Sequence, residues 1–469
     1  MTNPLKAKEY GKIEITDNNL FQCIMESLFS GANLSENAQH ERLGVHKTAD
    51  GYRALHYVGA IWLSHATQKD QRVPLIIYPK VHDETKILDA VAMLDKAVQY
   101  SEIFDASEKA SQEPIFKIFE DQEYVTSNDS VPDISMFQVV WYLKELASFC
   151  QRSIRQGFIR IDDNLIGKIK GKILIDEQIH KNFSRGRADR MACRYEIMTV
   201  DTLPNRILKY ALRLSTGLLN QKYGANNKAI SNIWIWARQA ESALSDVTLT
   251  TVKNKDFNTI HYSGSLSKYK SIHILAKAII SNLRIDASGS IQSTGSIIPF
   301  ALNMNTLYEA YVGVKLKQAG IDLLPQQTMS VKFGNGTKTF RPDFCSPCGK
   351  LIIDAKYKRY IEGNNEERIS ADLEQLIAYS VLVPACIAKK ANTVFNKARI
   401  PPNEHWAFLI VPSLEIDKEI SFKTNENGFF VIPNHIGSLL EIQFPIEGNG
   451  KLKAGLVECP VPRMDNPYK

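Results

Sequence analysis

The sequence lacks the features of a membrane or secreted protein. No apolar run among its 469 residues is long enough to cross a bilayer. The first residues, Met1–Lys6, contain no hydrophobic core of a secretory signal. The seven cysteines follow no disulfide pattern, which is typical of reduced thiols. We therefore expect a cytoplasmic protein with no membrane partner.

A phosphate-binding loop and a strong charge imbalance are also missing. No GxxxxGK[ST] pattern occurs in the chain, so any nucleotide-driven motor would have to be a separate polypeptide. The net charge of +6 is mild, and it permits DNA binding without requiring it. The apolar fraction of 44% and the charged fraction of 23% are those of an ordinary soluble protein.

The most informative segment contains two short strands, each of which carries an acid. A turn at residues 334–337 leads into an expected strand at 339–345, which carries Asp343. The second strand, at 350–354, is too apolar for a surface position, so we expect it to be central in its sheet. Asp354 and Lys356 are two positions apart on this strand and therefore point to the same face. Burying such a pair is costly unless a cation or a substrate uses it.

These residue types fit the hydrolysis of a phosphodiester. The reaction is very slow without a catalyst, so the site must lower the barrier by more than ~10 kcal/mol. A hard divalent ion held by carboxylates neutralises the phosphate and lowers the pKa of the attacking water. We predict Asp343 and Asp354 as metal ligands, with the Ala355 carbonyl completing the set, and Lys356 as the catalytic cation. The expected ion is Mg²⁺, with Mn²⁺ as the alternative.

Two expected helices flank these strands. The first, at 303–320, begins near an asparagine, ends at a glycine and carries Glu309 beside its apolar stripe, where this side chain can be a third acid. The second, at 370–383, places Gln375 and Tyr379 on one face. Either Glu309 or Gln375 taken alone is more typical of a solvated helix surface. The order of helix, two strands and helix favours a shared site.

At these residues the chain resembles the PD-(D/E)xK nuclease superfamily, because Pro342-Asp343 and Asp354-Ala355-Lys356 match its signature. The segment Asp354–Lys358 after an apolar strand is more specifically similar to the McrC family, the nuclease subunit of modified-cytosine restriction systems. Similarity to that family extends over about residues 150 to 385 and includes Gly167–Gly171, Asp201–Lys209 and Met304–Glu309.

The resemblance implies a partner as well as an activity. Members of the McrC family cut double-stranded DNA together with a separate AAA+ GTPase, which forms a ring, recognises methylated DNA and translocates it. The nuclease subunit docks into the ring through its N-terminal region and stimulates GTP hydrolysis. Two alternatives remain open. One is a PD-(D/E)xK nuclease of another defence or repair system, acting alone or with an ATPase, and the other is an inactive scaffold with the nuclease fold.

Basic residues are clustered in three places, at residues 168–172, 185–194 and 356–359. Lys168, Lys170 and Lys172 alternate along an expected strand, so we expect them to line one face. Runs of this kind are usually solvated surfaces, but they are also candidates for phosphate contacts. The full set of candidate DNA-binding residues is Lys168, Lys170, Lys172, Arg185, Arg187, Lys358, Arg359 and Tyr379.

The pattern of elements predicts an α/β protein, α+β overall, with three domains. Residues 1–130 form a β-rich module that is a candidate partner-docking region, although a helix is expected over 82–104 and an exposed linker over 105–133. Residues 131–296 form a mostly helical domain with a basic strand and loop. Residues 297–469 form the PD-(D/E)xK nuclease domain, with a central mixed sheet between helices.

Overall fold

The computed structural model divides the chain into two compact units. The first comprises Met1–Ser127, Lys228–Asn232 and Ile298–Lys469, and the second comprises Asn128–Asn227 and Ile233–Ile297. The N-terminal and C-terminal segments therefore belong to the same unit. The structure describes the chain outside residues 1–3, 14–20, 26–43, 49–50, 66–67, 69, 80–85, 112–113, 127–131, 153, 226, 287, 320–322, 334–335, 347–348, 350, 358–371, 373, 377, 380–403, 414–422, 425–429, 432–435, 444–450 and 466–469.

The first unit contains a five-stranded sheet that combines strands from the first 118 residues with residues 300–303. Strand β15 (Phe300–Asn303) lies between β4 (Tyr57–Ser64) and β7 (Phe116–Ile118) and is antiparallel to both. The other two strands are β5 (Arg72–Tyr78) and β1 (Leu5–Lys8), which pair in parallel. Strand β5 is almost continuously apolar, as a strand covered on both faces requires.

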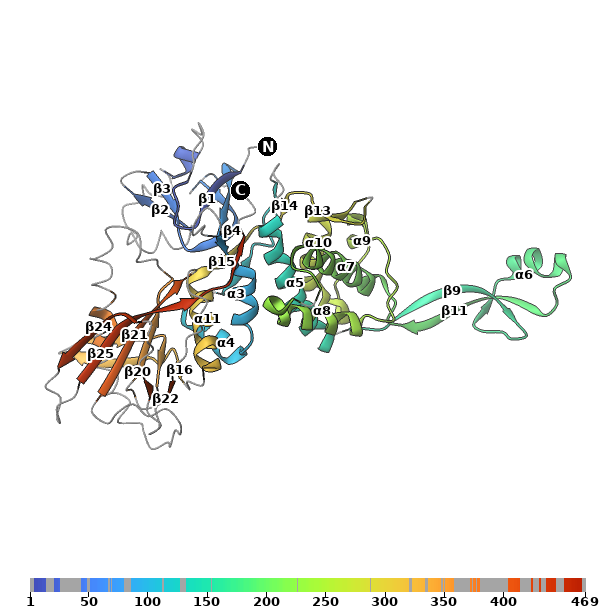
Figure 1. Ribbon diagram of the computed structural model, residues 1–469. Helices are drawn as coiled ribbons and strands as arrows, with labels where there is room; N and C mark the ends of the chain where they lie inside the picture. The colour runs from blue at the N-terminus through green and yellow to red at the C-terminus, as the bar shows by residue number, and fades with distance from the viewer. Residues whose placement is uncertain are drawn as a thin grey trace. The chain divides into compact units, whose positions relative to one another are not determined.

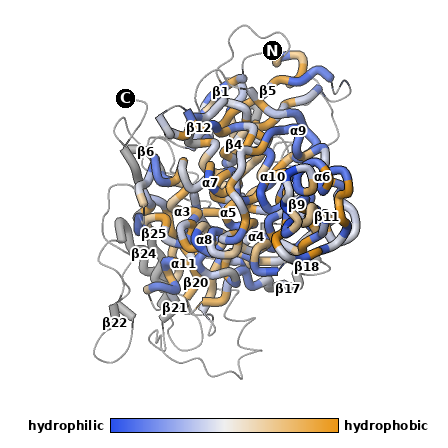
Figure 2. The backbone as a smooth tube through the Cα atoms, turned by 90° about the vertical axis from the view of Figure 1, so that its right-hand side faces the viewer, coloured by the Kyte–Doolittle hydropathy of each residue, from blue (hydrophilic) through white to orange (hydrophobic). Residues whose placement is uncertain are grey.

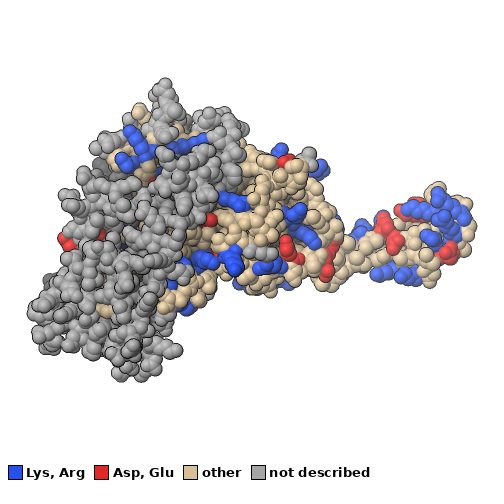
Figure 3. Space-filling view, viewed as in Figure 1, with Lys and Arg blue, Asp and Glu red and all other residues tan. Residues whose placement is uncertain are grey.

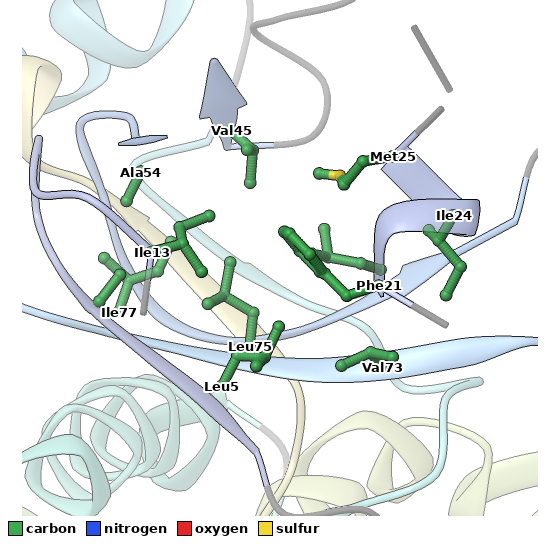
Figure 4. Close-up of a cluster of buried hydrophobic side chains, with 12 residues drawn as sticks. Leu5, Ile13, Phe21, Ile24, Met25, Val45, Ala54, Val73, Leu75 and Ile77 are labelled. Atoms are coloured by element: carbon green, nitrogen blue, oxygen red, sulfur yellow. The ribbon is translucent and has the colours of Figure 1, made fainter. Parts of the chain in front are cut away.

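Apolar side chains from several short segments form a core against this sheet. Leu5, Val73 and Leu75 come from its strands, while Phe21 and Met25 come from a short helical segment. Figure 4 shows these side chains pointing toward one another. Because each is 5% exposed or less, they contribute hydrophobic burial that the small sheet needs.

Helix α11 (Met304–Gln318) packs against α3 (Ala90–Ala97) and α4 (Ser101–Ser111). It begins where the sequence predicts, because the Asn303 side chain accepts a hydrogen bond from the Thr306 backbone N–H. The expectation of a single helix over 82–104 is wrong. Residues 86–88 form strand β6, and Asp89 caps a new helix by accepting from the Ala92 N–H. The expected linker over 105–133 is also wrong in part, because it contains the end of α4 and strand β7.

The site-bearing sheet has the order β16-β19-β20-β21-β25-β24. Strand β20 is central, as predicted, because its apolar residues Leu351, Ile352 and Ile353 are buried. It is antiparallel to β19 and parallel to β21, so the sheet is mixed. The bounds are β16 (Leu324–Pro325), β19 (Phe344–Cys345), β20 (Leu351–Ala355), β21 (Glu404–Ser413), β24 (Ile436–Gln443) and β25 (Lys451–Pro460).

Short ladders and turns complete the described elements. Their bounds are β2 (Val45–Thr48), β3 (Gly51–Ala54), β6 (Lys86–Leu88), β8 (Val125–Thr126), β12 (Leu283–Ile285), β13 (Ile291–Ser293), β14 (Ser296–Ile297), β17 (Met329–Phe333), β18 (Gly336–Phe340), β22 (Lys423–Thr424), β23 (Phe430–Val431), β26 (Arg463–Asp465), η2 (Lys228–Ile230) and η3 (Gly264–Leu266). Of these, β17 and β18 form the hairpin that precedes Asp343.

The second unit is built on helices. Helix α10 (Tyr269–Asn282) packs against α5 (Pro132–Arg152) and α7 (Leu203–Tyr223), and α8 (Ser231–Ala243) and α9 (Asn254–Phe257) lie nearby (Figure 1). The helices expected over 135–156, 202–219, 230–244 and 268–283 are confirmed with small shifts at their ends. The buried Tyr269 hydroxyl donates to Asn205 Oδ1 at 2.8 Å, so these two polar groups between α7 and α10 are satisfied.

A long two-stranded arm extends from the helices of the second unit (Figure 1). Strands β9 (Gly157–Ile166) and β11 (Arg190–Thr199) pair over ten residues, and the short strand β10 (Lys172–Ile173) joins β11 near the tip. The tip carries α6 (Ile175–Lys181) and the turn η1 (Phe183–Arg185).

The expectation that Lys168, Lys170 and Lys172 line one strand face is wrong, because only Lys172 lies in a strand. Gly167 and Gly171 adopt positive φ angles of 63° and 69° and turn the backbone between them.

Candidate active site

Two buried strands and one helix bring the predicted acids together. Asp343 immediately precedes β19, and its Oδ2 accepts a hydrogen bond of 2.7 Å from the Ala355 backbone N–H on β20. This bond ties the first acid to the end of the strand that carries Asp354. Glu309 comes from α11, and one side chain, Gln326, donates to both Glu309 and Asp343. Three acids from three elements therefore converge beside the end of β20.

Asp354 and Lys356 form an ion pair at this end of the sheet. Lys356 Nζ lies 2.8 Å from Asp354 Oδ2, and the two side chains are 22% and 3% exposed. The Lys356 backbone N–H donates to the Ile410 carbonyl at 2.9 Å, so β21 fixes the chain directly after β20. The lysine therefore leaves the strand in a defined direction, with part of its side chain accessible to solvent.

The electrostatics of the acids follow from their crowding. Burial raises the pKa of Asp343 well above its ordinary value, and the charges of Asp354 and Glu309 raise it further. Burial likewise raises the pKa of Glu309 to about 7, while hydrogen bonds from Gln326 and Ser107 act in the opposite direction. Both acids keep partial contact with solvent. A cation placed among them would favour their ionised forms.

The charges of the acids attract the Lys356 ammonium group, because it is a cation. Burial by itself lowers the pKa of this ammonium group, but the carboxylates of Asp354 and Asp343 outweigh burial and raise the pKa above its ordinary value. Lys356 is therefore a cation at neutral pH. Such a group can stabilise negative charge on a phosphate or a hydroxide, but it cannot accept a proton.

Two residues of this cluster were not predicted from the sequence. Ser107 on α4 donates to Glu309 Oε1 at 2.8 Å, although it lies 202 positions away in the chain. Gln326 follows β16 and donates to the same oxygen at 2.6 Å. No spacing signal points to Ser107. Gln326 lies 17 residues from both acids that it contacts, and only the pairing of β16 with β19 brings it to them.

The downstream candidates lie partly outside the described residues. Tyr379 is 7% exposed, and its ring meets the Phe340 ring edge-on at a centroid distance of 6.1 Å. Gln375 is exposed and donates to the Tyr379 hydroxyl at 2.6 Å. Burial raises the pKa of Tyr379, and the charges of Asp354, Lys356 and Asp343 also act on it, so this tyrosine borders the acidic cluster. Lys358 and Arg359 lie outside the described residues.

The oxygen donors of this cluster could hold a hard divalent cation such as Mg²⁺. Among the described residues, no three His, Cys, Asp or Glu side chains are arranged to hold a metal ion by themselves. A closed site of the zinc type is therefore not found in this part of the chain. Mg²⁺ usually takes one or two carboxylates and keeps several waters. Asp343, Asp354 and the Ala355 carbonyl are oxygen donors that fit such an ion, with Glu309 at its edge.

The remaining candidates lie on the arm. Lys168, Lys172, Arg185 and Arg187 are exposed near its tip, and Lys170 Nζ lies 4.3 Å from the centre of the Tyr195 ring. Figure 3 shows Lys and Arg side chains gathered at this tip. Arg194 instead makes two hydrogen bonds of 2.6 Å to Asp162 across the strands. The arm belongs to the second unit, whereas the acidic cluster belongs to the first.

Comparison with known proteins assigns the family. Residues 52–389 match the model of the McrBC 5-methylcytosine restriction system component, so the chain belongs to that family. Two solved structures are similar at 18% identity. One is a half-complex from a tetradecameric assembly of Thermococcus gammatolerans McrB AAA+ hexamers with bound McrC, with a TM-score of 0.37 over 98% of this chain and 95% of that chain. The other is the cryo-EM structure of the Thermococcus gammatolerans McrBC complex, with a TM-score of 0.29 over 69% and 90%.

Two negative findings accompany this assignment. No curated protein matches the chain. No helix in the described part of the structure is both long and apolar enough to cross a membrane.

Proposed function

We propose that this chain is the nuclease subunit of an McrBC-type restriction system. It would be a Mg²⁺-dependent endonuclease that cuts double-stranded DNA together with a separate AAA+ GTPase. Membership of the McrBC family supports this function, and one observation carries it. Glu309, Asp343 and Asp354 come from three separate elements and meet, together with Lys356, beside the end of β20. A structural core has no need of three acids and a lysine in one place.

The residues divide the chemistry among them. When bound, Mg²⁺ or Mn²⁺ neutralises the scissile phosphate and lowers the pKa of the attacking water. Asp343 and Asp354 hold the ion, and the Ala355 N–H keeps the Asp343 carboxylate turned toward β20. Lys356 acts as a fixed positive charge for the attacking oxygen or the phosphate, because its raised pKa keeps it protonated.

Glu309 and the downstream helix complete the site. Glu309 is a third acid whose pKa of about 7 lets it lose its proton when a cation arrives. Its hydrogen bond from Ser107 keeps the carboxylate aimed at the other acids. Gln375 and Tyr379 form a bonded pair at the border of the cluster, where they can contact the DNA strand that is cut.

Cleavage of plasmid DNA tests the activity. The purified chain is incubated with Mg²⁺ and DNA carrying modified cytosine, with and without the AAA+ subunit and GTP. We expect cleavage in the complete mixture and none with Asp354→Asn. The matched control is Asp121→Asn, which removes an exposed acid of the same unit. Equal cleavage by Asp354→Asn and the native chain would exclude this site as the catalytic one.

The arm is the surface that we assign to the AAA+ partner. Large apolar side chains are exposed along it, although exposure of this kind is unfavourable unless another molecule covers it. Figure 2, in which the arm faces the viewer, shows hydrophobic segments beside hydrophilic ones. The exposed residues are Phe158, Ile166, Ile169, Ile175, Ile179, Phe183 and Met198, whereas Ile235, Leu249 and Ile285 are the others of this kind among the described residues.

Stimulation of GTP hydrolysis tests this assignment. Replacing Ile175 and Phe183, which are 68% and 61% exposed, by Ser should abolish stimulation of the partner without changing the stability of the chain. Ile285→Ser is the control, because Ile285 is exposed in the same unit but lies outside the arm. Full stimulation by the double variant would instead favour the N-terminal module, residues 1–130, as the docking region.

The basic side chains at the arm tip remain candidate DNA contacts. Replacing Arg185 and Arg187 by Ala should weaken DNA binding and flatten its salt dependence, because fewer counterions are released. Fluorescence anisotropy with labelled duplex DNA at several salt concentrations measures both quantities. Unchanged binding would make Arg185 and Arg187 ordinary surface residues. Lys358 and Arg359 flank the catalytic strand in sequence and are tested in the same way.

A further inference from the structure

One amide side chain occupies the space between two acids of the candidate site. Gln326 Nε2 lies 2.6 Å from Glu309 Oε1 and 3.1 Å from Asp343 Oδ1, so both of its hydrogens are directed at carboxylates. Its backbone N–H donates to the Asp343 carbonyl at 2.8 Å. The residue is therefore held at the acids by its main chain and its side chain together.

The backbone of Gln326 supports a specific role. Its φ angle is +50°, in the left-handed region that side chains other than glycine seldom adopt. Among the described residues, Tyr10 is the other non-glycine residue with a positive φ. Strained conformations of this kind persist where the surrounding structure imposes them, and they are concentrated at functional sites.

The other end of the same amide has no hydrogen bond. Gln326 Oε1 is buried, and it has no donor among the described residues. A buried carbonyl oxygen without a partner is unfavourable, and a residue that served only as a clamp would have both ends satisfied. The unsatisfied oxygen therefore indicates a partner that is not among the described residues.

The charge of the acids identifies that partner. The NH₂ group of an amide carries partial positive charge, so it reduces the repulsion between Glu309 and Asp343. It cannot stay there when a cation binds, because its hydrogens would face the positive charge. A half turn about the Cγ–Cδ bond exchanges Nε2 and Oε1 without moving the backbone. After this turn, an oxygen donor faces the place where the hydrogens were.

We propose that Gln326 belongs to the metal-binding set of this protein. Its NH₂ group replaces the cation between Glu309 and Asp343 in the metal-free protein, and its Oε1 binds the ion, or a water on the ion, in the loaded protein. This inference rests on the proposed function, because it needs a divalent ion at Asp343 and Asp354. It adds a neutral side-chain oxygen to a site whose other side-chain donors are carboxylates.

Binding of Mn²⁺ to the full chain without DNA tests the proposal, by isothermal titration and by the electron paramagnetic resonance signal of free Mn²⁺. Gln326→Met keeps the length of the side chain but has no amide oxygen, and we expect its affinity to fall about tenfold. Gln326→Glu returns an oxygen donor with added charge and should bind at least as tightly as the native chain. Gln327→Met is the control, because Gln327 is the exposed neighbour of the same type.

A second variant keeps the proposal testable if Gln326→Met fails to fold. Gln326→Asn tolerates the left-handed backbone but is one methylene shorter, so it should fold and still lose affinity. Native affinity in both Gln326→Met and Gln326→Asn, or tighter binding, would overturn the inference and leave the nuclease site intact. If the native chain binds no Mn²⁺, and Asp354→Asn behaves identically, the proposed function fails together with this inference.

Discussion

Replacing Glu309 by Gln should make the metal-free protein more stable at alkaline pH. Burial raises the pKa of Glu309 from its ordinary value of 4.5 to about 7. The folded protein therefore holds this proton more tightly than the unfolded chain does. The resulting stabilisation is complete below pH 4.5 and is lost as the pH rises through 7. The amide in the Glu309→Gln variant keeps the hydrogen-bonding shape of the protonated acid and has no proton to lose.

The size of the expected loss in stability follows from the shift in the pKa of Glu309. The difference between 4.5 and about 7 corresponds to roughly 3 kcal/mol, since one pKa unit is worth about 1.4 kcal/mol. The native chain in EDTA should lose up to this free energy of unfolding between pH 5 and pH 8. Glu309→Gln should lose much less over the same range, and its advantage should appear only at the higher pH.

Urea unfolding at pH 5 and pH 8, with and without Mg²⁺, measures this difference. Glu120→Gln is the control, because Glu120 is an exposed acid of the same unit. Added Mg²⁺ should stabilise the native chain at pH 8 and have a smaller effect on Glu309→Gln, which lacks one acid. If Glu309→Gln has the same pH dependence as the native chain in EDTA, burial does not disfavour the ionised form of Glu309, and the reasoning on this cluster is refuted.

Three further predictions concern other residues. Lys356→Met should lower the rate of DNA cleavage about 100- to 1000-fold, because it removes a preorganised positive charge, and undiminished plasmid cleavage would contradict that role. Burial lowers the pKa of His273 to about 4, so the second unit should lose roughly 3 kcal/mol as the pH falls from 6.5 to 4, and urea unfolding of His273→Gln should lack this slope. Gly171→Ala should destabilise the arm tip by about 2 kcal/mol, because its φ is +69° and a Cβ would lie 2.4 Å from the Arg194 carbonyl oxygen. Hydrogen exchange at the tip measures this loss, and Gly167→Ala, which has a similar φ but open space around it, should cost less.

Local patterns in the sequence predicted the elements that carry the catalytic candidates. The apolar residues Leu351–Ile353 identified a central strand, and the spacing of Asp354 and Lys356 placed both side chains on one face, where they form an ion pair. Asn303 marked the start of the helix that carries Glu309. These features depend on periodicity and capping, which act within a few residues of the chain.

Irregular segments were predicted less well. Within the expected helix over 82–104, residues 86–88 form strand β6 and Asp89 caps α3 directly after it. The expected strand over 167–175 is broken by Gly167 and Gly171, which adopt positive φ. In both places the local composition fits more than one structure. Pairing with distant strands, such as β26 with β6 and β11 with β10, selects one of them.

The sequence alone identified the candidate acids, the lysine and the central strand that leads to Asp354 and Lys356, because these depend on residue type and short spacing. Only the tertiary structure joined the two ends of the chain into one unit and brought Ser107 and Gln326 to Glu309. Contacts across 202 positions leave no periodic signal, since they arise from sheet order and helix packing. The same packing gave Gln326 its left-handed backbone and its unsatisfied oxygen.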